Sequence, residues 1–328
     1  MAKRNQLEAD QPWAGKNKVI SSQAPVLVTG GEGFIGSHLV DLLVEKGFKV
    51  YSIDNSVGIS GWQNDRINPK AEYYSCDIRN FDKLLKFFLD VKPHYVFHTA
   101  ALARIQPSIK DPRAYLEVNS MGTLNVLLAS REAGVKRVIY SASSSAYGLN
   151  KIPLMESMTP DPLNPYAKTK LDGEQWMKLF AKLYGLETIS LRYFNVYGPR
   201  NAFSGPYTTV ITKFLHLRKE GKPMPVVGSG KQTRDYTHVS DIVRGNLLAA
   251  LSKKGGHGEV INLGCGEQHS VNEIAKLIGG KVEHEPPRRG EALHTLADRS
   301  LAKKLLGWEP NVKFKEGVQK LKKLYGIW

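Results

Sequence analysis

A tyrosine and a lysine four residues apart, Tyr166 and Lys170, form the pair in this sequence whose types and spacing most clearly suggest chemistry. Residues 166–183 read as a helix, so both side chains lie on one face, with the ammonium group close to the phenol. Because a neighbouring cation stabilises a phenolate, the pair predicts a tyrosine pKa that falls from about 10 toward the range of a general base. Ser143, upstream on a predicted turn, could share the same proton. Pairs with this spacing are also common on helix surfaces, so the pair alone does not identify a site.

Three glycines spaced three residues apart follow a short apolar run that begins at Pro25 and precede a predicted helix over residues 37–46. Gly30, Gly33 and Gly36 allow a tight turn, close approach of backbone amides to a pyrophosphate, and close helix packing. The partial positive charge at the helix N-terminus would face the phosphates. An isolated glycine pattern is weak evidence, but this strand–turn–helix context predicts a dinucleotide site.

An aspartate, Asp54, follows the second predicted strand over residues 49–53. It stands at about the distance past the glycines where a carboxylate binds the ribose hydroxyls of adenosine. Asp54 would repel a 2′-phosphate, and the next residues, Asn55 and Ser56, carry no compensating positive charge. The pattern therefore favours NAD over NADP, although an aspartate here could also cap a turn.

Strand and helix signals continue to alternate through the first half of the chain. The predicted strands cover residues 72–75, 95–98 and 137–141, and the predicted helices cover residues 81–89 and 111–133. Such alternation predicts an α/β fold with a doubly wound parallel sheet. Small residues, Thr99, Ala100 and Ala101, follow the strand over 95–98, as expected either where a cofactor passes over strand ends or where elements pack closely.

The composition argues against several other classes of protein. With 328 residues the chain can form one large domain or two intimate ones, and no stretch approaches the ~20 apolar residues of a membrane span. The formal charge of +15 is spread along the chain without a nucleic-acid reader motif. Two distant cysteines, Cys76 and Cys265, suggest neither a disulfide framework nor a metal site, and residues 1–24 form a polar extension. We expect a cytoplasmic protein with no metal and no membrane or nucleic-acid partner.

An ordered set of short motifs runs from about residue 25 to residue 328. The motifs are TGGEGFIG at 29–36, Asp54, CDI at 76–78, HTAA at 98–101, Asn119, SSSAYG at 143–148, the Tyr166 and Lys170 pair, LRYFNVYGP at 191–199, RDYTHV at 234–239 and RRGE at 288–291. Together they resemble the extended short-chain dehydrogenase/reductases, and most closely the nucleotide-sugar 4-epimerases that act on UDP-glucose or UDP-N-acetylglucosamine.

The resemblance implies a particular division of the chain. A Rossmann NAD-binding domain would cover residues 25–192, with the chain returning to it at about 233–264. A smaller C-terminal α/β domain, over 193–232 and 265–328, would bind the nucleotide sugar. The implied cofactor-binding residues are Gly30, Gly33, Phe34, Ile35, Gly36, Asp54, Asn55, Asp77, Ile78, Ala100, Ala101, Asn119, Tyr166 and Lys170. In relatives, helices corresponding to 111–133 and 166–183 form a homodimer, although their apolar faces could equally be buried within one subunit.

The resemblance also assigns roles to the chemical residues. Tyr166 would be the base, Lys170 would bind the nicotinamide ribose and lower the tyrosine pKa, and Ser143 would hydrogen-bond the reacting oxygen of the sugar. The implied substrate-binding residues are Arg104, Ser143, Ser144, Ser145, Asn195, Arg234, Arg288 and Thr295. The two arginines Arg234 and Arg288, with Asn195, resemble ligands of the UDP diphosphate, for which the guanidinium fork is well suited.

Ser144 and Ser145 narrow the range of reactions that we expect. Related dehydratases carry an Asp–Glu pair at the positions of Ser144 and Ser145, and related decarboxylases tend to carry glutamate at the position of Ser145. A site without these carboxylates can remove and return a hydride but lacks the groups that drive elimination. We therefore expect 4-epimerisation through a transient 4-keto sugar, with NAD unchanged at the end of the cycle.

One position bears on the sugar. Thr295 stands seven residues after Arg288, where a tyrosine in relatives restricts the site to plain hexoses and small residues admit N-acetyl groups. The expected substrates are UDP-GlcNAc and UDP-GalNAc, with UDP-Glc and UDP-Gal as further candidates. Arg104 keeps a UDP-glucuronate 4-epimerase open as an alternative, although Asn195 stands where such relatives often have threonine. A nucleotide-keto-sugar reductase would use the same tyrosine and lysine, whereas a non-enzymatic NAD-binding protein would commonly have lost one of them.

Overall fold

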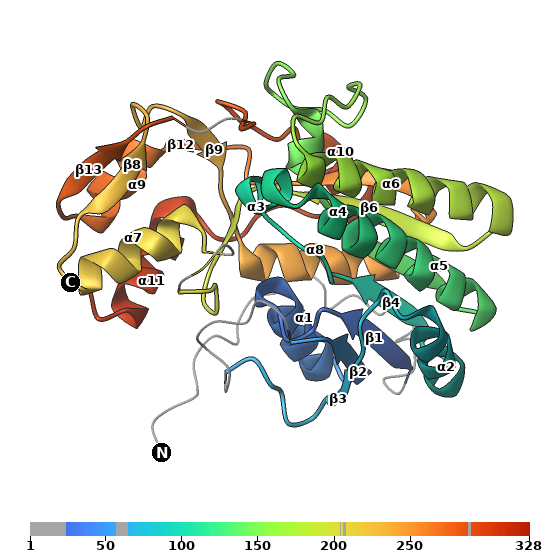
Figure 1. The fold of residues 1–328 in the computed structure, drawn as a ribbon. Coiled ribbons are helices and arrows are strands. Elements are labelled where there is room, and N and C mark those ends of the chain that lie inside the picture. Colours follow the sequence, from blue (N-terminus) through green and yellow to red (C-terminus); the bar gives the residue numbers. More distant parts are fainter. Residues whose placement is uncertain (1–23, 57–64, 204, 206–207, 288–289) are drawn as a thin grey trace.

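The computed structural model describes residues 24–328 except 57–64, 204, 206–207 and 288–289 (Figure 1). A large central sheet with helices on both faces makes up most of the molecule. A smaller part, coloured yellow to red at the left of Figure 1, contains short strands and three helices.

Seven strands form the central sheet in the order β11-β6-β5-β4-β1-β2-β3, and each neighbouring pair is parallel. Their bounds are β1 Pro25–Thr29, β2 Lys49–Asp54, β3 Glu72–Ser75, β4 Tyr95–His98, β5 Arg137–Ser143, β6 Glu187–Tyr193 and β11 His257–Leu263. Strands covered on both faces need continuous apolar runs, as in β1, where every residue after the first is buried. The order reverses between β1 and β4, which is where doubly wound sheets bind ligands. The predicted fold class is confirmed.

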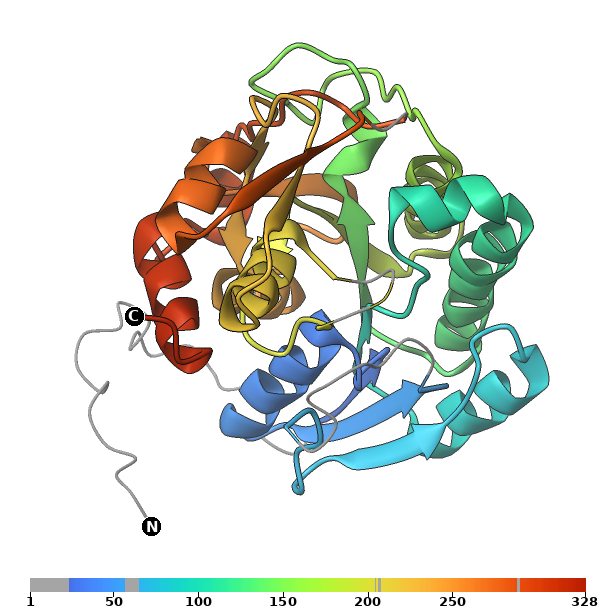
Figure 2. The ribbon, with the colours of Figure 1, turned by 60° about the vertical axis from the view of Figure 1, so that its left-hand side comes forward.

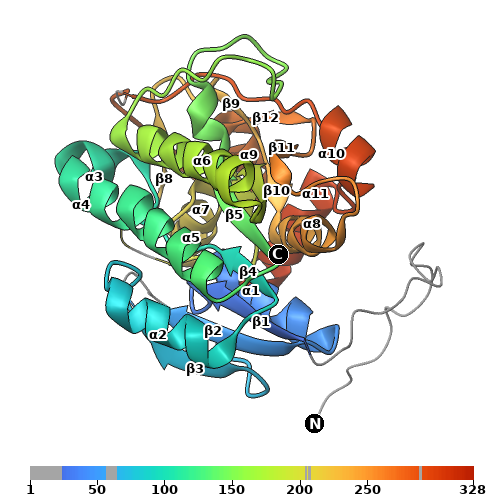
Figure 3. The same cartoon turned by 90° about the vertical axis from the view of Figure 1, so that its right-hand side faces the viewer.

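Helices cover both faces of this sheet, and each face has its own hydrophobic core. The helices are α1 Phe34–Glu45, α8 Val239–Leu251 and α10 Ser300–Leu306 on one face, and α2 Phe81–Val91, α5 Gly122–Glu132 and α6 Pro165–Tyr184 on the other. Leu39 of α1 and Ile242 of α8 are fully buried in the first core, and Phe88 of α2 and Met177 of α6 are fully buried in the second. Figure 3 shows α5 and α6 side by side.

Helix α6 begins and ends at residues suited to those positions. The side chain of Asn164 caps its first turn by accepting a hydrogen bond from the Ala167 amide, Pro165 occupies the first turn, and Gly185 ends the helix in the left-handed conformation. These signals set where the helix starts, and so which residues face the sheet. Lys170 is one of them and is almost fully buried.

The predicted helix over residues 111–133 is present as helical backbone from Pro112 to Glu132, with a π-helical segment inside it. Short helices α3 (Ile105–Lys110) and α4 (Pro112–Tyr115) are followed by a π-helical segment, Leu116–Met121, and then by α5. Asp111 separates α3 from α4 because its side chain caps α4 through the Ala114 amide, just before Pro112. The wider π-helical turn is a kind of feature that often occurs beside functional sites.

The smaller part consists of paired short strands packed against helices α7, α9 and α11. Its pairs are β7 (Val196–Tyr197) with β10 (Thr237–His238), β8 (Met224–Val227) with β13 (Val282–Glu285), and β9 (Thr233–Asp235) with β12 (Gln268–Ser270). Its helices are α7 Val210–Lys219, α9 Val271–Ile278 and α11 Phe314–Leu324. They share a third core, and Figure 2 shows their yellow, orange and red segments gathered on one side of the molecule.

The chain enters the smaller part after β6 and returns to the central sheet as α8 and β11 before leaving it again. The predicted division of the chain into two domains stays a prediction. Among the described helices, none combines the length and the apolar character needed to cross a bilayer.

Candidate active site

A cavity of about 1340 Å³ lies along the carboxyl ends of the central strands. Its walls include the glycine-rich turn after β1, the ends of β2, β4 and β5, the first turns of α6, and residues of the smaller part. Every predicted site residue lines it except Asn119 and Arg288, and Arg288 falls outside the described residues. The structure therefore brings together residues that are up to 265 positions apart (30 to 295) in the chain.

The close approach of α1 to the turn after β1 requires glycine at two positions, one in the turn and one in the first turn of the helix. Gly30 has a φ of +73°, and a Cβ on Gly36 would lie 2.0 Å from the Gly30 carbonyl oxygen. Helix α1 starts after Gly33, and no side chain of the described residues caps its first turn. Its first amides can therefore bind phosphate oxygens, which fits a dinucleotide held as predicted.

Asp54 at the end of β2 is held in place by two backbone amides. Its carboxylate accepts hydrogen bonds from the amides of Glu32, at 3.0 Å, and Ser56, at 2.9 Å. Burial raises the pKa of Asp54, while these hydrogen bonds oppose the shift. The side chain is thus oriented at the cavity wall before any ligand arrives, as a ribose-binding carboxylate requires.

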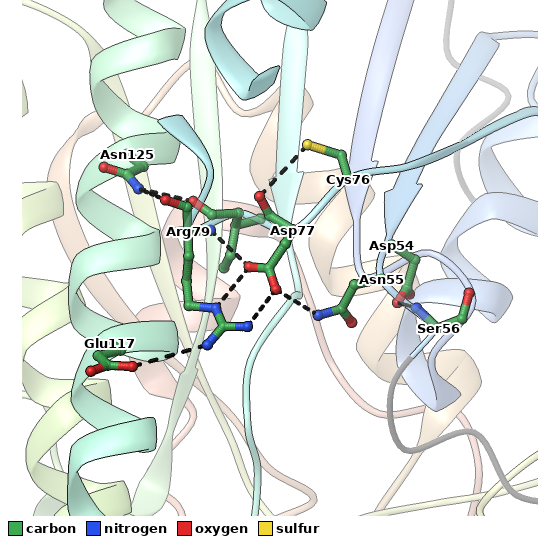
Figure 4. Close-up of polar contacts among 9 residues, drawn as sticks. Asp54, Asn55, Ser56, Cys76, Asp77, Arg79, Glu117 and Asn125 are labelled. Carbon is green, nitrogen blue, oxygen red and sulfur yellow. Dashed lines mark hydrogen bonds and ion pairs between the residues drawn. The ribbon is translucent and has the colours of Figure 1, made fainter. Parts of the chain in front are cut away.

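A second carboxylate at this end, that of Asp77, is bound to an arginine that the sequence analysis did not single out. Arg79 donates to Asp77 through Nε at 3.0 Å and through a terminal nitrogen at 2.7 Å, and Asn55 Nδ2 donates to it at 3.0 Å (Figure 4). Mainly because of the hydrogen bonds from Arg79, the pKa of Asp77 falls to about 2. Arg79 also lines the cavity. The sequence signal that could have identified Arg79 is its position two residues after Asp77, which the resemblance assigns to the cofactor.

The catalytic candidates meet where β5 ends and α6 begins. Ser143 ends β5, its hydroxyl accepts a hydrogen bond from the Ser145 hydroxyl at 2.8 Å, and it lies close enough to the Tyr166 phenol to influence its pKa. Lys170 lies one turn beyond Tyr166 and donates from Nζ to the Ser141 carbonyl at 2.8 Å. The tyrosine, the serine and the lysine thus lie on one short stretch of cavity wall, as predicted.

Burial governs the pKa values of both helix residues. It raises the pKa of Tyr166, with the Ser143 hydrogen bond and the charge of Arg104 opposing the shift, and it lowers the pKa of Lys170 to about 7, with Glu174 opposing. The expectation that Lys170 brings the phenol pKa below its usual range is therefore not met in this structure. The cation that acts on the phenol is Arg104, and the lysine is engaged with the Ser141 carbonyl.

Arg104 owes its position to an unusual backbone conformation. Its φ is +101° and its ψ is 140°, a region that non-glycine residues rarely adopt. The preceding residue is fixed by Tyr115, whose hydroxyl donates to the Ala103 carbonyl at 2.9 Å, and the Tyr115 ring packs edge-on to Tyr166. The chain thus keeps a strained residue next to the phenol, as is common at functional sites.

Asn119 supports the cavity wall from behind. It is 1% exposed, and its amide group accepts from the Leu102 amide at 2.8 Å and donates to the Leu102 carbonyl at 2.9 Å and to the Thr169 hydroxyl at 3.1 Å. The π-helical turn carries Asn119 into this position. The structure therefore does not place Asn119 where the resemblance implied, among the residues that line the cofactor cavity.

On the substrate side, Thr295 is held in a strap of residues 291–297 that contains no helix or strand. The Thr295 amide donates to the Thr233 carbonyl at 3.2 Å, and its hydroxyl accepts from the Asp235 amide at 3.2 Å. The fully buried Asp235 carboxylate accepts the amides of Cys265, Gly266 and Ala297 at 2.7–3.1 Å. Sequence reasoning missed this anchor, because nothing in the RDYTHV motif marks its aspartate as structural.

Arg234 lines the same wall, but its side chain is held by weaker interactions. It donates to the carbonyls of Thr233 and Leu293 at 3.0 and 2.9 Å, and its nearest carboxylate, that of Glu291, is 3.8 Å away. Asn195 lines the cavity between this wall and the catalytic residues. A guanidinium held by carbonyls and only loosely paired is suited to a phosphate.

Acidic side chains are absent from the catalytic part of the described lining. The lining carboxylates are those of Asp54 and Asp77 at the cofactor end and Glu291 opposite Arg234. At the positions next to Ser143 the structure has the hydroxyls of Ser144 and Ser145. The arrangement can move a proton and a hydride but offers no acid and base pair for eliminating water.

The chain matches known proteins over most of its length. Residues 26–264 match the model of the NAD dependent epimerase/dehydratase family. A UDP-glucuronate 4-epimerase of Thermodesulfobacterium geofontis is 36% identical over 309 residues, which cover 90% of this chain and 94% of that protein. The crystal structure of Thermotoga maritima UDP-glucose 4-epimerase with UDP-glucose has a TM-score of 0.87 and 37% identity, covering 92% of this chain and 98% of that one.

A second solved structure extends the range of sugars among the relatives. UDP-N-acetylglucosamine 4-epimerase from Methanobrevibacter ruminantium, in complex with UDP-N-acetylmuramic acid, has a TM-score of 0.85 and 35% identity, with 92% of this chain and 98% of that chain covered. The predicted family and the predicted cofactor are confirmed. The chain belongs to the NAD-dependent epimerase/dehydratase family, as one of its nucleotide-sugar epimerases, and its cofactor is NAD.

Proposed function

We propose that this NAD-dependent nucleotide-sugar 4-epimerase interconverts UDP-GlcNAc and UDP-GalNAc, with UDP-Glc and UDP-Gal as further substrates. The observation that carries the proposal is the small side chain of Thr295 on the cavity wall, where the resemblance places the substituent at C2 of the sugar. A threonine there leaves room for an acetamido group that a tyrosine would fill. One of the similar structures, that of the Methanobrevibacter ruminantium protein, is a UDP-N-acetylglucosamine 4-epimerase.

Tyr166 is the proposed acid and base. When bound, NAD would supply the group that accepts a hydride from C4 of the sugar and donates it back. In its ionised form the Tyr166 side chain takes the proton of the 4-hydroxyl and later gives it back, while Ser143 hydrogen-bonds the reacting oxygen. Burial raises the pKa of Tyr166, and the positive charge of Arg104 opposes that shift and so favours the phenolate that this step requires.

Lys170 and the substrate-side residues have positioning roles in this proposal. Lys170 binds the nicotinamide ribose, and Asp54 binds the adenosine ribose. Asn195, Arg234 and Arg288 bind the UDP diphosphate and keep it in place while the keto sugar turns over. Arg288 lies outside the described residues, so its role rests on the sequence resemblance alone.

A UDP-glucuronate 4-epimerase is the second candidate, and one observation favours it. Arg104 is a cation fixed beside the catalytic tyrosine, where it could attract a sugar carboxylate as well as stabilise the phenolate. The UDP-glucuronate 4-epimerase of Thermodesulfobacterium geofontis is also among the similar proteins. A reductase that uses the same tyrosine and lysine would consume NADH in proportion to product.

We also propose a homodimer formed through α6 and the π-helical segment. Five apolar side chains there are between 39% and 58% exposed: Leu116, Met121, Leu179, Leu183 and Tyr184. Apolar exposure shared by neighbouring helices is typical of an interface. The molar mass measured by light scattering checks the proposal, and a monomer at micromolar concentration would contradict it. A cytoplasmic location remains a prediction.

The substrate proposal is tested by incubating the protein with each of the three UDP-sugar pairs, the N-acetylhexosamines, the hexoses and the uronates, and measuring kcat/KM in both directions. We expect the highest value for the UDP-N-acetylhexosamine pair and no net change in NADH. A higher value for the uronate pair would favour the second candidate, and stoichiometric oxidation of added NADH would indicate a reductase.

A further inference from the structure

Arg66 is a buried arginine on the cavity wall to which neither the sequence motifs nor the resemblance gives a role. It follows β2 by twelve residues, and only 3% of it is exposed to solvent. One terminal nitrogen donates to the Arg200 carbonyl at 2.8 Å, and the other lies 3.5 Å from the Glu32 carbonyl in the glycine-rich turn. Arg66 therefore connects that turn to the chain segment that follows β7.

The Arg66 guanidinium has carbonyl partners but no carboxylate within ion-pair distance among the described residues. Its Nε is buried and has no hydrogen-bond partner in the part of the chain that the structure describes. Burial lowers the pKa of Arg66, the charge of Arg200 adds to the shift, and Asp54 opposes it. An arginine nevertheless stays protonated in proteins, so this is a buried cation without a counter-ion among the residues that the structure describes.

A buried cation of this kind calls for an anion in the adjoining space. The adjoining space is the cavity, since Arg66 lines it together with Gly33 and Phe34 of the glycine-rich turn and the start of α1. The amides that begin α1 are the other positive group at this place. Two positive groups of different origin thus meet where the pyrophosphate of a dinucleotide would lie.

We propose that Arg66 binds the pyrophosphate of NAD and closes the glycine-rich turn over it. This inference rests on NAD as the cofactor and is independent of which sugar is epimerised. The arginine would supply a charge-assisted hydrogen bond to the phosphate, in addition to the neutral amides of the turn. Its bond to the Arg200 carbonyl would at the same time join the cofactor to the smaller part of the molecule.

A purely structural role is the competing explanation. In that case Arg66 would only hold the Arg200 segment in place, and losing it would weaken every ligand in the cavity alike. Arg200 itself is a useful control, because its side chain pairs with Asp41 at 2.6 Å and does not line the cavity, while only its carbonyl contacts Arg66. Arg200→Gln removes a nearby positive charge and leaves that carbonyl in place.

The test compares ligands with and without phosphate on cofactor-free protein. Calorimetry or competition would give the dissociation constants of ADP, adenosine and UDP for wild type, Arg66→Gln, Arg66→Lys and Arg200→Gln. Loss of one charged hydrogen bond predicts that Arg66→Gln binds ADP about ten- to a hundredfold more weakly, with adenosine changed less than about twofold. Arg66→Lys should lose less than Arg66→Gln, because it keeps the charge but not the fork.

The other outcomes each overturn the proposal. Equal weakening of ADP and adenosine would make Arg66 structural. Weakening of UDP with ADP unchanged would move the arginine to the substrate diphosphate. An equal loss of ADP affinity in Arg200→Gln would show that general positive potential, and not a bond from Arg66, is responsible. Circular dichroism of each variant shows that the comparison is made between folded proteins, and Arg66→Lys serves if Arg66→Gln does not fold.

Discussion

The two long walls of the cavity are built in different ways. On the catalytic wall, Ser143 ends a central strand, and Tyr166 and Lys170 stand on a helix of 20 residues with caps at both ends. On the substrate wall, Thr295 stands on the strap of residues 291–297, which is held by bridges to single residues and by the Asp235 carboxylate. The comparison teaches that the proposed catalytic residues are positioned by regular elements, whereas the proposed sugar contact stands on a segment anchored at a few points.

Removing the Tyr166 hydroxyl should have the largest effect on activity, because this hydroxyl is the proposed reacting group of the catalytic wall. Tyr166→Phe keeps the ring and its packing but loses the proton acceptor, so kcat should fall by about 10² to 10⁴. Retained NAD and an unchanged melting temperature would show that the fold survives. Near wild-type turnover would remove Tyr166 from the mechanism and, with it, the assignment of this wall.

The support behind the catalytic wall is expected to be nearly as sensitive. Glu174, one turn beyond Lys170, makes a two-pronged ion pair with Arg192 at 2.8 and 2.6 Å, and each residue is 3% exposed or less. Glu174→Gln leaves a buried cation without its partner, which should lower the free energy of unfolding by about 3–5 kcal/mol. Denaturant unfolding measures the change.

The exposed pair of Glu132 with Arg131 provides the matched control for that variant. Glu132→Gln should change the free energy of unfolding far less than Glu174→Gln, since surface pairs contribute little. Similar changes in both variants would mean that the buried Glu174 pair contributes no more to stability than the exposed Glu132 pair.

The substrate wall should respond selectively. Thr295→Tyr places a ring where the acetamido group is proposed to lie, so kcat/KM for UDP-GlcNAc and UDP-GalNAc should fall about ten- to a hundredfold. The hexose pair should lose little. Thr295→Val is the control, because it removes the hydroxyl that accepts the Asp235 amide but keeps the size. An equal fall for both sugar pairs would make this position structural.

The smallest effect is expected at the cofactor end, from a substitution that leaves the fold unchanged and removes a single charge. Asp54→Asn keeps the shape and one acceptor oxygen, so NAD should bind about tenfold more weakly as a charged hydrogen bond becomes neutral. NADP should be affected less, because the variant also removes repulsion of a 2′-phosphate. Equal changes for both cofactors, measured by fluorescence titration, would separate Asp54 from cofactor choice.

Much of the catalytic wall could be predicted from the sequence, because its signals are local. The glycine spacing predicted the turn, and the distance of four residues between Tyr166 and Lys170 predicted that their side chains share one face of a helix. The doubly wound sheet followed from alternating strands and helices. Local patterns could not predict the π-helical turn, since its Asn119 is held by Leu102 and by Thr169 of another helix.

The substrate wall and the electrostatics were much less predictable. Asp235 binds the amides of Cys265 and Ala297, which are 30 and 62 residues away, so no short motif reveals the anchor. The predicted lowering of the Tyr166 pKa failed for a related reason. The sequence spacing indicated that Lys170 lies near Tyr166, but the shift in the Tyr166 pKa depends mainly on burial. Burial arises only when the whole cavity is assembled.

The return of the chain to the central sheet has a consequence for making and dividing this protein. Strand β11, which pairs with β6, comes from between the two stretches that form the smaller part. A fragment that stops before β11 would expose β6 as an unpaired edge, which invites aggregation. No single cut in the gene therefore yields two self-sufficient fragments, and the two parts should melt together in one calorimetric transition.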